Sequence, residues 1–196
     1  VKPARQAVTG EGICIGLSFS KTAFVHPETA RDQELIHQIV EVVRSHKELE
    51  HICFTSIQIN HDAISAHTDN NLEGCPSIAI GLGDYVGGRL RITGARRPLH
   101  ICDHAVVFNG LQTHHLETQR RPLVLVLFAH ASWAKLSEET ADELRKLGLP
   151  RPIENYSGYN VVLPAAVDPV SILAKAGSSD DPVIKDEFAE EVPTER

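Results

Sequence analysis

The stretch SIAIGLGDYVGGRLRI, residues 77–92, contains two short apolar segments separated by a glycine-rich turn. The same arrangement continues on both sides of it, in ICFTSIQI (52–59), HAVVFNG (104–110) and PLVLVLFAH (122–130). Short apolar segments separated by Gly, Pro and Asn turns are typical of antiparallel sandwiches and barrels. The sequence therefore predicts an all-β centre, with a β core over about residues 50–132.

The segments outside this centre predict one further strand and two helices. GICIGLSFS (12–20) has the flanking glycines and branched residues of a strand. Apolar residues at helical spacing predict a helix over about residues 29–47, with Thr29 and Asp32 as capping candidates near its start. A second helix is expected over 137–147, with Ser137 as its N-cap.

Length and composition indicate one domain, residues 1–176, followed by an acidic and flexible tail, 177–196. The longest apolar run, 122–129, is far shorter than the roughly 20 residues of a membrane span, so a soluble chain is expected. Four scattered cysteines without a CxxC pair favour a reducing compartment, the cytoplasm or the nucleus. The sequence does not indicate an oligomeric state.

The charges of the chain are unevenly distributed. Residues 177–196 hold seven acids and two bases, whereas the remainder of the chain is nearly neutral, although the formal net charge is −7. Proteins that bind nucleic acid usually carry a basic stripe, because phosphate neutralisation supplies much of the affinity. The basic clusters here are small, so charge permits a nucleic-acid partner without indicating one. They comprise Arg89, Arg91, Arg96 and Arg97, and then Arg120 and Arg121.

A candidate metal site begins in AHTDNNLEG, residues 66–74. Alternate side chains of a strand share a face, so His67 and Asp69 can bind one ion from the same side. The alternative is an ordinary polar turn. A third ligand is expected from His114 or His115, at the entry to the strand in 122–128. Two histidines and one carboxylate leave coordination positions open, as in non-haem Fe(II) oxygenases, and zinc could occupy the same ligands.

Four motifs, in this order along the chain, resemble the iron(II)/2-oxoglutarate-dependent dioxygenases. They are HTDNN (67–71), GLGDYVGGRLRI (81–92), HAVVFNGLQTHH (104–115) and RRPLVLVLF (120–128). The resemblance implies a double-stranded β-helix, a cupin-like jelly-roll core, with the 29–47 helix packed on it. Within the family, the chain looks most like the 5-methylpyrimidine (TET/JBP-like) dioxygenases that act on nucleic acid.

The resemblance also implies the cofactors and the residues that hold them. Fe(II) is expected on His67, Asp69 and a distal histidine, for which His114 is preferred because it follows Gly110 as in the family's G-x3-H motif. Arg121 is expected to bind the C5 carboxylate of 2-oxoglutarate in preference to Arg120, since arginine binds carboxylates bidentately. Asn60 is expected either to hold the cosubstrate or substrate or to end a strand in a turn.

The implied activity is oxidation of a C–H bond by dioxygen, with decarboxylation of 2-oxoglutarate to succinate and CO2. A methylated nucleic-acid base is the first substrate hypothesis. The alternatives are an oxygenase that acts on a protein side chain or small molecule, or a catalytically idle jelly-roll module that binds a partner. A basic rim near the metal, formed by the arginines of 89–97, would favour nucleic acid.

Overall fold

The computed structural model describes residues 11–20, 22–61, 65–83, 87–102, 104–118, 123–149, 152 and 161–163. The predicted acidic tail, 177–196, lies outside the described residues, so the domain boundary at 176 remains a prediction. No helix within the described residues is long and apolar enough to cross a membrane.

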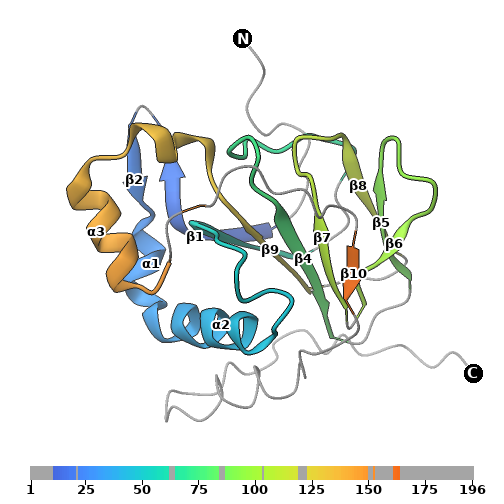
Figure 1. Ribbon diagram of the computed structural model, residues 1–196, viewed down its shortest axis with the longest axis horizontal. Helices are drawn as coiled ribbons and strands as arrows, with labels where there is room; N and C mark the ends of the chain where they lie inside the picture. The colour runs from blue at the N-terminus through green and yellow to red at the C-terminus, as the bar shows by residue number, and fades with distance from the viewer. Residues whose placement is uncertain are drawn as a thin grey trace, which may run out of the picture.

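Strands form most of the regular secondary structure among the described residues (Figure 1). The strands are β1 (Glu11–Phe19), β2 (Ala23–Val25), β3 (Ser56–His61), β4 (Ser77–Leu82), β5 (Gly87–Ile92), β6 (Leu99–His100), β7 (Ala105–Phe108), β8 (His114–Thr118), β9 (Leu123–Phe128) and β10 (Val161–Leu163). The helices are α1 (Pro27–Arg31), α2 (Gln33–Ser45), α3 (Glu138–Lys146) and the 3-10 helix η1 (Ala131–Lys135). Each apolar segment named from the sequence overlaps one or two of these strands, which confirms the all-β centre.

The strands lie in two sheets, a seven-stranded one in the order β10-β7-β4-β9-β3-β1-β2 and a three-stranded one in the order β6-β5-β8. Their antiparallel pairs are nested. β3 pairs with β9, a single bridge joins His67 to His114 at the start of β8, β4 pairs with β7, and β5 pairs with β6. First-with-last nesting of four pairs across two sheets is the jelly-roll topology. The fold is therefore a double-stranded β-helix, mostly β with flanking helices, as predicted.

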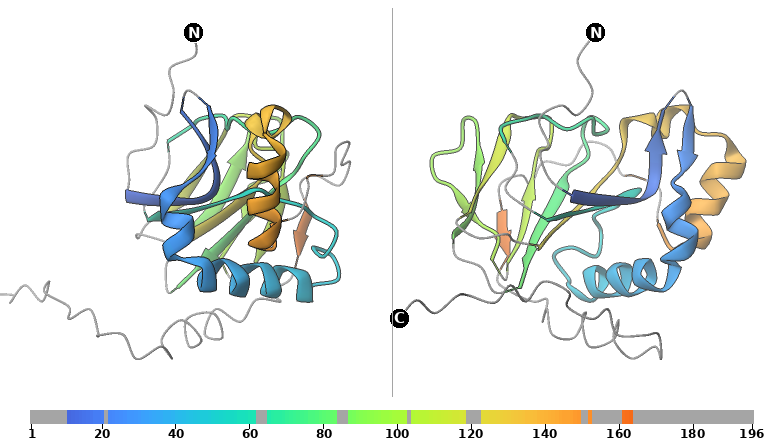
Figure 2. Two further views of the ribbon diagram at one scale, coloured as in Figure 1. Left: turned by 90° about the vertical axis from the view of Figure 1, so that its left-hand side faces the viewer. Right: turned by 180° about the vertical axis from the view of Figure 1, so that it is seen from behind.

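Helices α2 and α3 cover one face of the larger sheet (Figures 1 and 2). α2 is amphipathic: its apolar residues recur every three or four positions and are buried on one side, as a core-facing helix requires. They are Ile36, Ile39, Val40 and Val43. These residues belong to one core cluster with Ile57 of β3 and Leu125 and Leu127 of β9. Full burial of each such side chain contributes about 1.5–3 kcal/mol.

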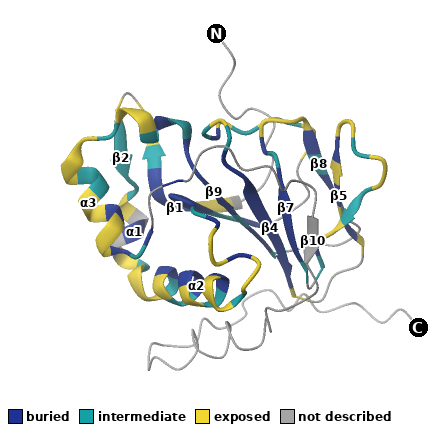
Figure 3. Cartoon of the chain, viewed as in Figure 1, coloured by how far each residue is buried: buried dark blue, intermediate teal, exposed yellow. Residues whose placement is uncertain are grey.

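A second core fills the space between the two sheets. Val124 of β9 and Phe108 of β7 meet Leu90 of β5 and Leu116 of β8 there. In β5, buried and exposed residues alternate, so its arginines face away from this core (Figure 3). The barrel interior is thus mostly apolar, so a polar side chain that points into it is a candidate for a functional role.

The prediction of one helix over 29–47 is wrong at its beginning. α1 and α2 are separate helices that meet at Asp32, whose side chain makes no capping hydrogen bond. Thr29 is not a cap either, because its buried Oγ1 accepts a hydrogen bond from Gly16 N at 2.8 Å. This contact with β1 is tertiary, so the local pattern could not predict it. By contrast, Ser137 caps α3 as predicted, accepting from Thr140 N.

The two candidate histidines also lie in a different element from the one predicted. They were expected to enter the strand of residues 122–128, but His114 and His115 begin a strand of their own, β8, which pairs with β5. The sequence of β8, HHLET, contains one apolar residue, Leu116, which is buried in the barrel. A strand with a single apolar residue gives too weak an alternation to be recognised.

Candidate metal centre

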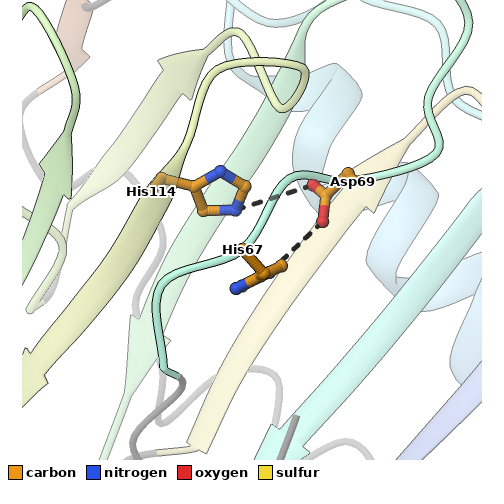
Figure 4. A group of neighbouring side chains, drawn as sticks. All are labelled: His67, Asp69 and His114. Carbon is orange, nitrogen blue, oxygen red and sulfur yellow. Dashed lines mark ion pairs between the residues drawn. The ribbon is translucent and has the colours of Figure 1, made fainter. Parts of the chain in front are cut away.

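His67, Asp69 and His114 come together from two segments that are far apart in the sequence (Figure 4). The backbones of His67 and His114 exchange two hydrogen bonds, of 3.0 and 2.9 Å, and Asp69 N donates to Gly110 O at 2.9 Å. The regular strand expected at 67–69 is instead an extended segment with one bridge. These backbone bonds fix the position of both histidines, and they bring Asp69 to the same place.

The side chains of the three residues converge. One ligand atom from each residue lies within 4.8 Å of the others. His67 Nε2 is 3.4 Å from Asp69 Oδ1, and His114 Nε2 is 3.7 Å from Asp69 Oδ2. The side chain of His114 is only 6% exposed, while those of His67 and Asp69 retain 16% and 22% exposure. The cluster is therefore largely enclosed but can be reached from solvent on the His67–Asp69 side.

Both imidazole rings are oriented by a backbone carbonyl. His67 Nδ1 lies 2.7 Å from Ser65 O, and His114 Nδ1 lies 2.8 Å from Gln112 O. A carbonyl oxygen only accepts, so Nδ1 carries the proton in each ring. In the neutral rings Nε2 then keeps its lone pair, and both Nε2 atoms face Asp69. Metal-binding histidines are commonly held in this way.

The surroundings act on the two histidines in opposite directions. The hydrogen bond that Asp69 accepts from protonated His67 raises the pKa of His67, against the effect of burial. Burial lowers the pKa of His114, against the attraction of Asp69. Phe108 contributes to this burial, with its ring in edge contact with His114 at a centroid distance of 5.0 Å. Burial thus favours the neutral form of His114, which is the form that binds a metal.

The carboxylate of Asp69 is held by Asn71, which Ser77 binds in turn, and it lies against Gly110; none of these three was predicted as part of the site. Asn71 Nδ2 donates to Asp69 Oδ2 at 3.3 Å and to Ser77 Oγ at 2.7 Å. A Cβ atom at Gly110 would lie 2.7 Å from Asp69 Oδ2, and it would also collide with Asn71, so only glycine fits there. The sequence signals were the second asparagine of HTDNN and the glycine of FNG, both of which also occur in ordinary turns.

The donor set fits a divalent transition metal. Ligand atoms about 2.1 Å from one ion and at right angles to one another lie about 3 Å apart, slightly closer than the separations measured here. Two imidazole nitrogens and one carboxylate on the same side are the arrangement that non-haem Fe(II) centres use, and zinc accepts the same donors. The residues would therefore hold an ion with the remaining coordination positions open. His115 does not take part: its Nε2 lies 3.6 Å from Glu117 Oε1.

Asn60 lies within β3, one residue before its end, and is 8% exposed. It pairs with Val124, which belongs to the barrel core, so its side chain faces the barrel and does not form a turn. Gln58, two residues earlier, faces the same side, and its Oε1 is buried without a hydrogen-bond partner among the described residues. Gln58 was not predicted. Arg120 and Arg121 lie outside the described residues.

Neither a family model nor a curated protein sequence matches the chain. Among solved structures, the chain is similar to NgTET1 in complex with 5mC DNA, at 14% identity and a TM-score of 0.45, covering 69% of this chain and 69% of that one. It is also similar to OsALKBH1, at 13% identity and a TM-score of 0.32, covering 62% of this chain and 80% of that one. The strand pairing of the chain itself defines its fold as a double-stranded β-helix.

Proposed function

We propose that the chain is a non-haem Fe(II)- and 2-oxoglutarate-dependent dioxygenase. The observation that supports this most directly is the cluster of His67, Asp69 and His114 on a jelly-roll core. A polar turn would explain His67 and Asp69, but it would not explain why a buried His114 presents Nε2 to the same carboxylate. The motif resemblance in the sequence supports iron as the ion and an oxygenase as the class.

The residues of the cluster would bind and orient the ion. His67 and His114 offer Nε2, because each Nδ1 proton is held by a carbonyl oxygen. Asp69 offers a carboxylate oxygen, and Asn71 keeps that carboxylate from rotating. Phe108 shields His114 from water. When bound, Fe(II) and 2-oxoglutarate supply the activation of dioxygen and the oxidation of a C–H bond, with release of succinate and CO2.

The cosubstrate is assigned to Arg121 and Asn60. Arg121 is chosen on the motif resemblance, since its guanidinium would bind the C5 carboxylate bidentately. The barrel-facing position of Asn60 supports its part in the proposal, because a buried amide requires a hydrogen-bond partner and 2-oxoglutarate would offer one. The neighbouring Gln58 places a second amide on the same side.

The substrate proposed first is a methylated nucleic-acid base, on the basis of the sequence resemblance. A protein side chain or a small molecule is the alternative. Mass spectrometry of methylated DNA and RNA oligonucleotides after turnover tests this choice. A gain in mass on an oligonucleotide supports the proposal, and no gain on any of them favours the alternative.

The activity itself is tested by succinate formation. Protein incubated anaerobically with Fe(II) and 2-oxoglutarate, and then exposed to oxygen, should produce succinate even without the main substrate. Asp69→Ala should weaken iron affinity by more than the roughly ten- to hundredfold that is typical for residues outside the ligand set. It should also form no succinate. Glu73→Ala, which removes an exposed carboxylate from the same loop, is the matched control and should retain both.

Unchanged iron occupancy in Asp69→Ala would show that the metal centre is misplaced. Metal binding that depends on Asp69 without any succinate from the wild-type protein would contradict the oxygenase and favour an idle jelly-roll module.

A further inference from the structure

The outer side of the smaller sheet carries exposed arginines of β5. Buried and exposed residues alternate in β5, so Leu90 and Ile92 enter the barrel while Arg89 and Arg91 point outward. The cross-strand neighbours of Arg89 are His100 of β6 and Glu117 of β8, and the neighbour of Arg91 is His115 of β8. The loop after β5 adds Arg96 and Arg97, both exposed. We call this surface the basic face: Arg89, Arg91, Arg96, Arg97, His100 and His115.

Among the described residues of this region the bases outnumber the acids, and Asp103 lies outside the described residues. Residues 87–102 and 104–118 contain four arginines and one acid, Glu117. Glu117 Oε1 lies 2.8 Å from Arg91 Nε, so it is paired with that arginine. Arg89, Arg96 and Arg97 make no ion pair within the part of the chain that the structure describes. Three guanidinium groups therefore remain for an external anion.

The basic face lies directly behind the metal centre. In the pairing of β5 with β8, Arg91 is opposite His115 and Ile92 is opposite His114. Adjacent residues of a strand point to opposite sides of a sheet, so His114 faces the proposed metal while its neighbour His115 lies on the basic face. The loop that carries Arg96 and Arg97 starts at the same end, where Thr93 N donates to Thr113 O at 2.8 Å.

We propose that the basic face binds the phosphodiester backbone of a single-stranded nucleic acid, which then passes around the edge of the smaller sheet to the metal centre. This inference rests on the proposed function and specifies its substrate class. Phosphates are the anions that a row of exposed arginines recognises best, through bidentate hydrogen bonds. A single strand is favoured over a duplex because only 5% of the residues are aromatic, and extraction of a base from a duplex needs a wedge or stacking side chain.

The net charge of −7 does not oppose this binding strongly. Exposed charges more than about 10 Å apart are largely screened at 0.1 M salt, so a local group of arginines acts largely independently of acids on other surfaces. Seven of the acids lie in residues 177–196, outside the described structure. A negative net charge of the whole sequence is thus compatible with a surface that is locally positive.

Binding of a labelled single-stranded oligonucleotide, measured by fluorescence anisotropy over a range of salt concentrations, tests the proposal. The measurement omits iron and 2-oxoglutarate. The triple variant Arg89→Gln, Arg96→Gln, Arg97→Gln should bind at least tenfold more weakly at low salt. Three lost phosphate contacts should also reduce the slope of log affinity against log salt by about 2, at about 0.7 for each contact.

The matched control is Lys47→Gln, Lys135→Gln, Lys146→Gln, which removes the same charge from exposed lysines outside the smaller sheet. It should bind nearly as tightly as the wild type. An equal loss in both triple variants would overturn the proposal, because the attraction would then be general. Equally tight binding of polyglutamate would also overturn it, in favour of an acidic protein segment.

The metal-site variant Asp69→Ala separates this proposal from the proposed function. It should bind the oligonucleotide like the wild type while it forms no succinate. Weaker oligonucleotide binding in the arginine variant would therefore support the basic face even if no succinate formed. Succinate formation would likewise support the oxygenase even if the arginine variant bound the oligonucleotide normally.

Discussion

A single buried asparagine, Asn71, orients the carboxylate at the centre of the candidate site. Both hydrogens of its amide are used, one by Asp69 Oδ2 and one by Ser77 Oγ. Its Oδ1 is buried and has no hydrogen-bond partner among the described residues. A buried carbonyl without a partner destabilises the fold. Asn71 thus orients the carboxylate of Asp69 while contributing little to the stability of the fold.

This imbalance leads to a prediction for Asn71→Ala. The variant should bind Fe(II) or Mn(II) roughly ten- to hundredfold more weakly, the usual effect of removing a residue that orients a metal ligand. The melting temperature of the metal-free protein should change little, because the two lost hydrogen bonds are offset by removal of the unsatisfied carbonyl. Metal titration and thermal unfolding in a chelator measure the two effects.

The adjacent Asn70 provides the control, since its side chain is exposed. Asn70→Ala should leave metal affinity unchanged. A large loss of stability in Asn71→Ala with unaltered metal affinity would show that Asn71 supports the fold and not the site.

At the scale of elements, β9 is a strand whose two faces are both in contact with a core. Val124 belongs to the core inside the barrel, whereas Leu125 and Leu127 belong to the core beneath the helices. Its sequence is therefore almost continuously apolar, as expected for a strand covered on both sides. Such a strand gives no alternation from which the facing of the arginines before it could be derived.

The choice between Arg120 and Arg121 is for this reason a prediction to be tested by substitution. Arg121→Ala should weaken 2-oxoglutarate binding by about 2–5 kcal/mol, roughly thirtyfold or more, because a buried carboxylate would lose its cation. Iron should remain bound, and Arg120→Ala should behave like the wild type. The measurement is the 2-oxoglutarate concentration needed for half-maximal succinate formation.

If Arg120→Ala gives the larger effect, the anchor is the neighbouring residue. If neither substitution has an effect, 2-oxoglutarate is bound by other residues or is not the cosubstrate.

At the scale of the whole molecule, the candidate metal centre connects the two halves of the nested strand pairs. His67 follows β3 in the first half, and His114 begins β8 in the second. An ion would bind to both residues only in the folded protein, since the unfolded chain does not hold the ligands together. Metal binding should therefore stabilise the whole fold.

Thermal unfolding measures this coupling. At a free metal concentration a hundred times its Kd, binding should add about 2.7 kcal/mol, which raises the melting temperature of a chain of this size by about 5–10 °C. A chelator should reverse the shift, and Asp69→Asn should abolish it. A shift of equal size in Asp69→Asn would mean that the ion binds elsewhere.

The sequence by itself determined the local features of this protein. Apolar segments of strand length between glycine and proline turns predicted β4, β7 and β9, and a capping serine predicted the start of α3. These features depend on neighbours in the chain. The motif containing His67 and Asp69 was equally visible, whereas the preference for His114 over His115 came from the resemblance to a known family.

Only the tertiary structure decided which distant residues meet. It divided the predicted first helix at Asp32, and it bonded Thr29, a predicted cap, to β1. It placed Asn71 and Gly110 against Asp69, and it turned Arg89 and Arg91 of β5 to the outer side of the smaller sheet in a chain that is acidic overall. Hydrophobic patterning acts over a few residues, whereas these contacts depend on which strands pair, and strand pairing is decided by the packing of the two cores.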